Sequence, residues 1–420
     1  MKNSRKILLG LGLLSLALPA SAQNYGGARK KEPEKVATGA KVTLPSGREV
    51  VLSVKASTAI VELQTAVRAK DQAAIRSKLA AAQKEAKSAD EKYLVAMLQN
   101  QAAMEANDLD GIKRSIEAIA ASGSPDATDV SARYIDLGKR YRAAGRTAEA
   151  DALLQKSASA DPGSPAALAL MADAKAKAGD KAGAVALMQQ SLAAARAKGQ
   201  KPAESNYRFA AGLAYEIKHA AAADLAEQWV AAYPAPGSWR TAIQIYRATR
   251  TSTPAQLADI MRLARTTDAL KTEADFHAYA DALVKTGALG EAKAVIADAG
   301  RTPGIDITKQ QFKDVAAKAA KAPSRAAIDA QAKTALAGGT ATQLMAAGDA
   351  LYGQEAYAEA APLYRAALAK GGDTNLANLR LGMALARAGD KAGAEVALKA
   401  VTGPNALIAK FWLGYVGTLR

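Results

Sequence analysis

The sequence repeats with a period of 34 residues, and this feature constrains the fold more than any other. Three positions near the carboxyl end recur 34 residues later, as Gly348 and Gly382, Ala360 and Ala394, and Tyr364 and Leu398. A fixed period of this length is typical of stacked helix-turn-helix units. Because each unit buries its apolar face only against its neighbours, the length of 420 residues does not predict a number of globular domains.

A second pair of repeats occupies residues 131–198. The markers of its first copy are Leu137, Gly138, Tyr141, Gly145, Ala150, Leu154 and Pro162. The markers of its second copy are Met171, Ala172, Gly179, Ala184 and Met188. In order and spacing, both copies resemble the tetratricopeptide repeat (TPR) family. The resemblance implies an all-α fold, an α-solenoid of stacked TPR-like helix-turn-helix hairpins that forms a right-handed superhelix.

Steric considerations explain the residue types at the marker positions. Gly138 and Gly382 lie where the first helix of a hairpin must approach its partner, so a small side chain lets the two backbones come close. Gly145 and Gly389 are expected in the turns between helices, where a left-handed backbone costs glycine little. Glu355 takes the equivalent place in another repeat, a departure that the family tolerates.

Weaker matches extend the repeat pattern over most of the chain. One runs from Phe276 to Pro303, and another joins Asn107 to a helical row ending at Ile119. The predicted regions are a signal peptide (1–22), a flexible arm with a possible small β-hairpin (23–56), an N-terminal helical region with a weak repeat (57–130), two TPR repeats (131–198), divergent TPR-like hairpins (199–340), and two TPR repeats with a C-terminal capping helix (341–420).

The first 22 residues have the pattern of a secretory signal peptide. A basic start is followed by the apolar run Ile7 to Leu18 and by the small-residue pattern Ala20-Ser21-Ala22, so we expect cleavage after Ala22. The style of this signal is bacterial, which favours a periplasmic location. No later stretch of about 18 uncharged apolar residues follows, so no transmembrane anchor is expected. The absence of cysteine excludes disulfides.

The mature chain is predicted to be basic. Of 56 lysines and arginines, three lie in the expected signal peptide, so 53 remain against 40 acidic residues and the formal charge is +13. This balance favours anionic partners such as an envelope polysaccharide. The alternative is that the cations keep alanine-rich helices soluble. Nucleic acid is not an expected partner of an exported chain.

Motifs for catalysis are missing from the sequence. His219 and His277 are the only histidines, and neither has a second histidine or a cysteine at the spacing of a metal site. No nucleophile elbow, zinc-protease pair or phosphate-binding glycine loop is present in the mature chain. We therefore expect no catalytic residue, no metal and no cofactor, and a protein that is not an enzyme.

One segment partly matches a calcium-binding loop. Asp108, Asp110, Gly111 and Glu117 occupy four of its places, but Ala106 stands where the first ligand belongs. The alternative is that Asp108 belongs to the turn and amino-terminal cap of a helix, as its position before a helical pattern indicates.

The TPR resemblance implies a concave groove lined by the first helices of the hairpins, which would receive a protein or peptide partner of the cell envelope. Near the carboxyl end the groove residues would be Met345, Tyr352, Leu379, Met383, Arg387, Phe411 and Tyr415. In the repeats at 131–198 they would include Lys139, Arg142 and Lys177. Phe411 and Tyr415 are equally well explained as core residues of the last hairpin.

Two functions are compatible with these features. The first is a non-catalytic periplasmic TPR scaffold or adaptor that binds envelope proteins or peptides through its groove. The alternative is a basic factor that binds an anionic envelope polysaccharide during its export or handling. Salt separates them, because binding led by net charge weakens steeply as salt rises, whereas binding led by apolar contacts does not.

Overall fold

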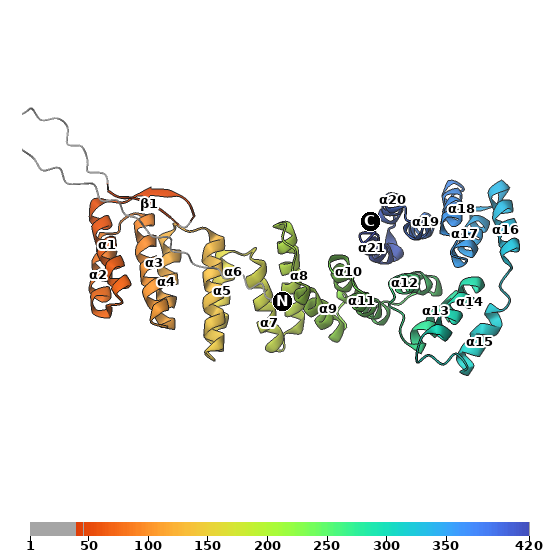
Figure 1. Ribbon diagram of the computed structural model, residues 1–420, viewed down its shortest axis with the longest axis horizontal. Coiled ribbons are helices and arrows are strands. Elements are labelled where there is room, and N and C mark those ends of the chain that lie inside the picture. Colours follow the sequence, from red (N-terminus) through yellow and green to blue (C-terminus); the bar gives the residue numbers. More distant parts are fainter. Residues whose placement is uncertain (1–38, 45, 420) are drawn as a thin grey trace, which may run out of the picture. The chain divides into compact units, whose positions relative to one another are not determined.

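The computed structural model describes residues 39–44 and 46–419, and most of these lie in helices (Figure 1). The predicted signal peptide and the predicted arm as far as residue 38 lie outside the described residues. The expected all-α array of helical hairpins is confirmed. The chain divides into two compact units, and the boundary falls between Ala174 and Lys175, inside the region predicted as two repeats.

The first unit starts with two short strands and continues as helices. Its elements are β1 (Lys41–Thr43), β2 (Glu49–Val51), α1 (Val54–Ala69), α2 (Gln72–Glu85), α3 (Ala89–Glu105), α4 (Leu109–Ser122), α5 (Ala127–Ala143), α6 (Thr147–Ala160) and most of α7 (Pro165–Lys177). Successive helices pair as hairpins, α1 with α2, α3 with α4, and α5 with α6. The first helix begins at Val54 rather than at residue 57, because the Ser53 side chain accepts a hydrogen bond from the Ala56 N–H and caps it.

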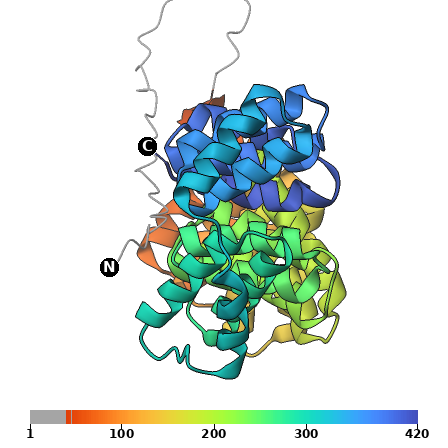
Figure 2. The same ribbon diagram turned by 90° about the vertical axis from the view of Figure 1, so that its right-hand side faces the viewer.

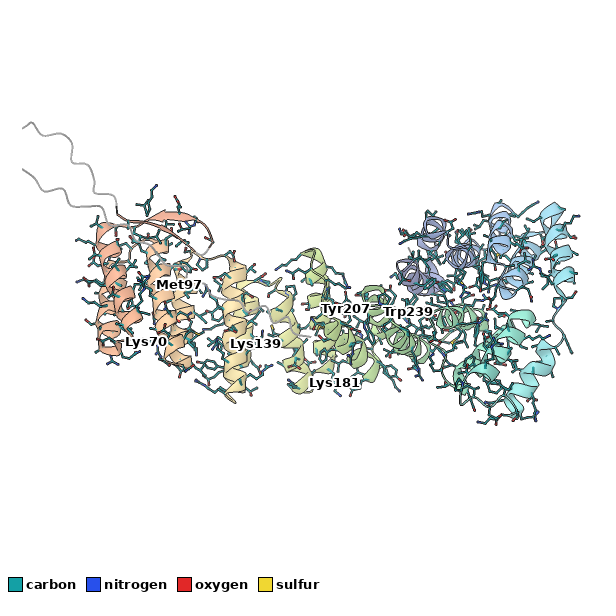
Figure 3. The ribbon with its side chains drawn as sticks, viewed as in Figure 1. Lys70, Met97, Lys139, Lys181, Tyr207 and Trp239 are labelled. Carbon is teal, nitrogen blue, oxygen red and sulfur yellow. The ribbon has the colours of Figure 1, made fainter. Side chains whose placement is uncertain are left out.

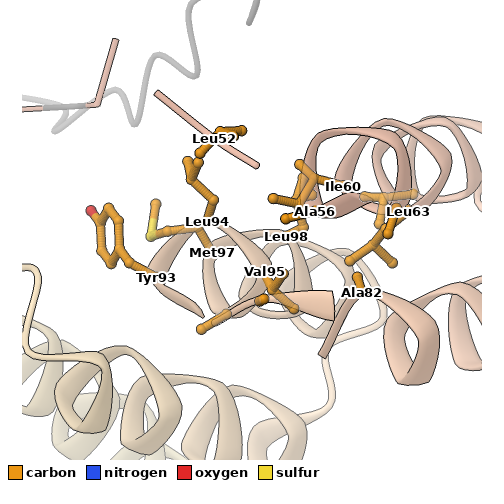
Figure 4. Close-up of a cluster of buried hydrophobic side chains, with 14 of the residues drawn as sticks. Leu52, Ala56, Ile60, Leu63, Ala82, Tyr93, Leu94, Val95, Met97 and Leu98 are labelled. Atoms are coloured by element: carbon orange, nitrogen blue, oxygen red, sulfur yellow. The ribbon is translucent and has the colours of Figure 1, made fainter. Parts of the chain in front are cut away.

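The predicted β-hairpin is confirmed. β1 and β2 pair in antiparallel register with Val42 opposite Val50, and both valines are buried. A two-stranded hairpin is marginal by itself. Here it gains support because its apolar side packs with Leu52 against α1 and α3, where Leu52 lies above Leu94 (Figure 4).

Glu91 ties this hairpin to the helices. Its carboxylate accepts hydrogen bonds from the N–H groups of Ser53 (2.8 Å), Lys87 (2.8 Å) and Ser88 (2.9 Å). The side chain is 3% exposed. Burial favours its protonated form, but the three N–H groups outweigh burial and lower the pKa of Glu91 to about 2. One carboxylate therefore joins the starts of α1 and α3.

The second unit contains two consecutive arrays of helices. The middle array comprises α8 (Lys181–Ala197), α9 (Glu204–Glu216), α10 (Ala222–Ala232), α11 (Pro236–Thr249), α12 (Pro254–Thr266), α13 (Glu273–Lys285), α14 (Leu289–Arg301) and α15 (Gln310–Ala319). The C-terminal array comprises α16 (Arg325–Gly338), α17 (Ala341–Gly353), α18 (Tyr357–Ala369), α19 (Thr374–Ala388), α20 (Lys391–Lys399), the short 3-10 helix η1 (Gly403–Asn405) and α21 (Ala406–Val416).

The C-terminal array folds back on the middle array. Helix α14 packs on α17, while α10 and α12 pack on α21, so helices far apart in the sequence lie side by side (Figure 2). The predicted capping helix is α21, which covers α20 as expected and also contacts α10 and α12. The middle array is therefore covered by a later part of the same chain.

The predicted turn residues adopt the left-handed backbone. Gly145, Gly179 and Gly389 have φ values of 78°, 89° and 85°, and Glu355 has a φ of 60° at the equivalent place. A residue with a Cβ pays a steric cost there that glycine does not. No helix among the described residues is both long and apolar enough to span a membrane.

Candidate functional site

The hairpin of α5 and α6 brings two backbones together at the marker glycine. A Cβ atom added to Gly138 would lie 3.4 Å from the carbonyl oxygen of Ala150 and 3.4 Å from Leu154 Cδ2. The predicted close approach of the two helices at this residue is confirmed. Gly138 and Leu154, which is itself only 2% exposed, thus lie in contact where α5 meets α6.

Tyr141 fixes α5 on α4. Its ring is fully buried, and its hydroxyl donates a hydrogen bond to Asp110 Oδ1 at 2.7 Å. Burial and the Asp110 carboxylate raise the pKa of Tyr141 to about 12, so the hydroxyl keeps its proton and remains a donor. Arg146 lies over the tyrosine ring, 4.3 Å from its centroid, and pairs with the same carboxylate at 3.0 Å. The position of α5 is thereby set by packing and by hydrogen bonds.

An open pocket of about 260 Å³ lies beside the marker glycine, between α5, α6 and α7. Its lining residues are Gly138, Lys139, Arg142, Ala143, Leu154 and Leu170. The leucines and the alanine form apolar walls, and the two cations stand at the rim. Two of the three basic residues predicted for the groove of this region therefore meet at one pocket.

The two cations at the rim differ in their surroundings. Arg142 is half-buried and joins three helices, because its guanidinium lies 2.6 Å from Asp151 Oδ1 on α6 and 3.4 Å from Asp173 Oδ2 on α7. Lys139 is exposed and projects from α5 (Figure 3), and its ammonium makes no ion pair with any described residue. Arg142 thus holds the pocket together, while Lys139 is available to an anionic group of a ligand.

Lys177, the third basic residue predicted for the groove of this region, lies outside the pocket. It is exposed at the end of α7, and it does not line the pocket.

The groove residues predicted near the carboxyl end are mostly interior. Tyr352 is 5% exposed, and Leu379, Met383 and Phe411 are fully buried. The prediction that these four line an open groove is corrected, because the helices of the middle array and the neighbouring helices of the C-terminal array cover them. Phe411 is a core residue, as the alternative interpretation has it, but its ring packs edge-on against Tyr246 of α11 in the middle array at 5.8 Å, outside the last hairpin.

The other three of these residues are only half-buried. They are Met345 on α17, Arg387 on α19 and Tyr415 on α21. Arg387 contacts the middle array, because its guanidinium donates to Thr266 Oγ1 at 2.7 Å. The Tyr415 ring packs edge-on against Trp412 at 5.9 Å. Arg387 and Tyr415 therefore make contacts inside the second unit.

A network of buried charges lies where the two arrays of the second unit meet. Arg262 is 3% exposed, and its guanidinium binds the Glu291 carboxylate through Nη2 at 2.6 Å and Nε at 3.0 Å. Its Nη1 donates to Asp259 Oδ1 at 2.6 Å. The hydroxyl of Tyr279 donates to Glu291 Oε1 at 2.5 Å, and the Tyr352 ring lies against the guanidinium with its centroid 4.9 Å away.

The same network continues into the C-terminal array. Arg380 on α19 is 5% exposed; its Nε lies 3.3 Å from Asp259 Oδ1, and its Nη1 pairs with Asp349 on α17. Asp349 also accepts a hydrogen bond from the Tyr364 hydroxyl at 2.9 Å. The indole N–H of Trp412 donates to the carbonyl oxygen of Asp259 at 3.2 Å. Charged groups from α12, α14, α17 and α19 therefore share one interior.

Sequence reasoning missed this network. Asp259 and Arg262 stand one helical turn apart in a helix whose residues from Ala258 to Ala264 are all buried. An ion pair between residues i and i+3 usually marks a solvated helix face, so the pattern by itself favours a surface location. The available signal was the apolar residues that flank both charges on every side, which indicate a helix buried all round.

The residues that resemble a calcium loop have structural partners. Asp108 caps α4, because its Oδ1 accepts a hydrogen bond from the Gly111 N–H at 2.9 Å, so the capping interpretation is confirmed. Asp110 binds Tyr141 and Arg146, and Glu117 pairs with Lys156 at 2.6 Å. These carboxylates serve three separate contacts.

The histidines also have structural surroundings. His219 Nδ1 accepts a hydrogen bond from the Ala221 N–H at 3.2 Å, and the His277 ring packs edge-on against Phe312 at 5.9 Å. Within residues 39–44 and 46–419, no group of three histidine or acidic side chains has the arrangement of a metal site.

Comparison with solved structures finds repeat proteins. A tetratricopeptide repeat protein from Parabacteroides merdae matches with 14% identity and a TM-score of 0.26, over 70% of this chain and 99% of that one. The pentatricopeptide repeat protein PPR10 from maize matches with 16% identity and a TM-score of 0.28, over 85% and 46%. A circular tandem repeat protein matches with 14% identity and a TM-score of 0.16, over 86% and 81%.

No family model and no curated protein sequence matches the chain. At the low TM-scores of the solved structures, the assignment of the fold rests on the chain's own repeats. Those repeats, with their marker glycines at the helix contacts and in the turns, make the described chain an all-α array of stacked TPR-like hairpins.

Proposed function

We propose that the protein is a non-catalytic scaffold of the cell envelope that binds a segment of a partner protein in the pocket between α5, α6 and α7. The observation that carries the proposal is the pocket itself. It combines the apolar walls of Leu154 and Leu170 with the exposed ammonium of Lys139 at its rim. We expect the bound segment to place an apolar side chain in the pocket and an acidic side chain beside Lys139.

The chemistry of the pocket supports a peptide rather than a small molecule. The pocket is open to solvent along one side, and its two cations differ in role because Arg142 is already paired with Asp151 and Asp173. Ligand pockets for small molecules bury most of the ligand surface. An open pocket between helices suits an extended chain, most of which stays outside.

The test compares capture of partner proteins by matched variants. Mature protein (residues 23–420) is immobilised and exposed to a bacterial envelope extract, and the captured proteins are quantified for the wild type, Leu170→Glu and Lys139→Glu. Lys370→Glu is the control, because Lys370 is an exposed lysine that directly follows α18 and the same charge change occurs away from the pocket. The proposal predicts proteins whose recovery falls about tenfold or more with both pocket variants and is unchanged with the control.

The salt dependence separates the alternative partner. If an anionic polysaccharide were the ligand, Lys139→Glu and Lys370→Glu would weaken binding equally, and binding would decline steeply between low and moderate salt. Equal recovery of every captured protein by the wild type and both pocket variants would refute the pocket as a binding site.

The periplasmic location is part of the same proposal. It is supported by the basic start, apolar run and Ala20-Ser21-Ala22 pattern of the first 22 residues. The expected result is a periplasmic protein whose first residue is Gln23, as mass spectrometry of the amino-terminal peptide would determine. Recovery of the uncleaved chain from the cytoplasm would contradict it.

A further inference from the structure

A second pocket lies in the first unit, beside the second helices of two hairpins. It has a volume of about 380 Å³ and lies between the end of α2, the first half of α3 and the end of α4. These three helices are neighbours (Figure 1). The TPR resemblance implies a groove lined by first helices, whereas α2 and α4 are the second helices of their hairpins. The pocket is therefore separate from the expected groove.

Small apolar side chains form the walls of this pocket. Val95 and Ala96 of α3 are each 2% exposed, and Ala86, which follows α2, is 3% exposed. Ala118 and Ala121 of α4 complete the walls. Because the alanine side chain ends at Cβ, the helices leave space between them and present flat surfaces. Such walls suit a flat, rigid apolar group such as an aromatic ring.

The pocket has one hydrogen-bond acceptor without a donor. Gln99 of α3 lines the pocket, and its Oε1 is buried and accepts no hydrogen bond from any described residue. The nearby Ser122 hydroxyl does not supply the donor, because it already donates to the carbonyl oxygen of Ile119 at 2.6 Å. A buried acceptor without a donor costs free energy. Since the last torsion of a glutamine side chain turns easily, this oxygen can meet a donor in the pocket.

An unpaired cation stands two helical turns away on the same helix. Lys92 lines the pocket, is exposed, and makes no ion pair with any described residue. It directly follows Glu91, whose buried carboxylate fixes the start of α3. Gln99 stands seven positions after Lys92, which is about 10 Å along one face of the helix. The pocket therefore offers a cation, an apolar stretch and an acceptor in a row.

We propose that this pocket binds a free hydroxyaryl carboxylate, a small molecule with a carboxylate and a hydroxyl at opposite ends of an aromatic ring. The carboxylate pairs with Lys92, the ring lies against Val95 and Ala96, and the hydroxyl donates to Gln99 Oε1. A rigid ring loses little conformational freedom on binding. Both ends of the ligand are satisfied within the pocket, so no longer chain is needed. This inference goes beyond the α5–α7 pocket and does not depend on it.

The test measures binding of para-hydroxyphenylpropionate to the mature protein (residues 23–420) by calorimetry. Three variants each change one feature of the pocket. Lys92→Met removes the cation and keeps the stem, Gln99→Met removes the acceptor, and Ala121→Leu fills the pocket from an exposed position. Lys139→Met is the matched control, because it makes the same change at the α5–α7 pocket. The comparison ligand is phenylpropionate, which lacks only the hydroxyl of the probe.

The expected result is binding of the probe that weakens by about tenfold or more with Lys92→Met and with Ala121→Leu and is unchanged with Lys139→Met. Gln99→Met should weaken binding of the probe by about fivefold or more and leave binding of phenylpropionate unchanged, because only the probe has a hydroxyl to donate. Bound probe should slow hydrogen exchange in α3 and α4 and leave α5 unaffected, and every variant should keep the wild-type exchange of α5 and α6.

Three results would overturn the proposal. One is no binding of the probe to the wild type at about 10 mM. Another is equal weakening of both ligands by Gln99→Met, which would show that Gln99 does not accept the hydroxyl of the probe. The third is binding of a capped peptide with an internal tyrosine followed by glutamate at least as tight as binding of the probe, which would assign the pocket to a protein chain instead of a free small molecule.

Discussion

The hairpin of α5 and α6 and the hairpins around α17 and α19 follow the same 34-residue pattern but have opposite surroundings. The residue after the marker glycine is Lys139 in α5, which is exposed, and Met383 in α19, which is fully buried. The repeat pattern places a glycine where the two helices of one hairpin meet. It does not determine what covers the face of the hairpin, which depends on helices far away in the sequence.

The difference also appears in the charges. In the first unit Arg142 joins its carboxylates at the protein surface, where water screens the pairs and each contributes about 0–1 kcal/mol. In the second unit Arg262 joins Asp259 and Glu291 with all three side chains no more than 3% exposed. Similar ion pairs therefore have different consequences, and the three predictions below test this contrast.

The largest effect is expected from Arg262→Met. The change leaves Asp259 and Glu291 without their main cation in a buried site, so we expect the free energy of unfolding of the second unit to fall by about 3–5 kcal/mol. Tryptophan fluorescence during urea unfolding measures this, because Trp229, Trp239 and Trp412 all lie in the second unit.

The matched control is Arg142→Met in the first unit. Hydrogen exchange of α5 and α6 should show that the free energy of unfolding falls by less than about 1 kcal/mol, because Asp151 and Asp173 remain hydrated. A loss of the same small size in both variants would show that water reaches the buried network, and the contrast between the two regions would disappear.

A smaller effect is expected from adding one methyl group at the marker glycines. A Cβ atom on Gly382 would lie 2.5 Å from Leu398 Cγ, so Gly382→Ala forces the leucine to move and should cost about 1–3 kcal/mol. At Gly138 the nearest atoms are 3.4 Å away, an ordinary contact. Gly138→Ala should therefore be neutral or slightly stabilising, because alanine is the better helix former.

Fluorescence-monitored unfolding measures Gly382→Ala, and hydrogen exchange of α5 measures Gly138→Ala. Equal costs at the two glycines would show that the α5–α6 hairpin is packed as tightly as the α19–α20 hairpin. In that case looser packing of the α5–α6 hairpin would not explain the open pocket beside Gly138.

The repeats were predictable because the interactions that define them lie within single hairpins. Gly138, Gly145 and Gly389 each act within one hairpin, and a period of 34 residues reveals them without knowledge of the rest of the chain. The β-hairpin at β1 and β2 was predictable from its turn and β-branched residues for the same reason. Lys139 and Arg142 were predicted as groove residues because both lie on the first helix of a repeat. The pocket that they share was not predicted.

The fold-back of the C-terminal array was not predictable in this way. It depends on contacts such as Trp412 with Asp259, whose partners are far apart in the sequence. Aromatic and methionine residues on a concave face are typical of a binding surface and equally typical of a buried contact within the chain. Tyr352 and Met383 illustrate this ambiguity. Their sequence pattern would be the same on an open binding surface and in a buried contact, and only a covering helix distinguishes the two.

The smallest effect concerns pH, and its sign should differ between the two units. On α10, Glu227 faces Lys410 of α21, with Asp224 and Arg196 nearby. Burial raises the pKa of Glu227 to about 7, against an ordinary value of 4.5. The unfolded chain therefore loses this proton at lower pH than the folded one, and the free energy of unfolding of the second unit should fall between about pH 4.5 and pH 7.

Glu91 in the first unit behaves in the opposite way. Its pKa is lowered to about 2, so its stabilising contribution is complete above about pH 4.5 and is lost as the pH falls toward 2. Glu227→Gln should remove the decline of the second unit and stabilise it by about 1–2 kcal/mol at pH 8. Glu395→Gln, a change of a half-buried residue on α20 that pairs with Lys399, is the control that should leave the decline in place.

Tryptophan fluorescence over this pH range measures the second unit, and hydrogen exchange of α1 and α3 measures the first. If Glu227→Gln left the decline unchanged, the carboxylate would be hydrated in the folded protein, and the contact of α10 with α21 would be open to water.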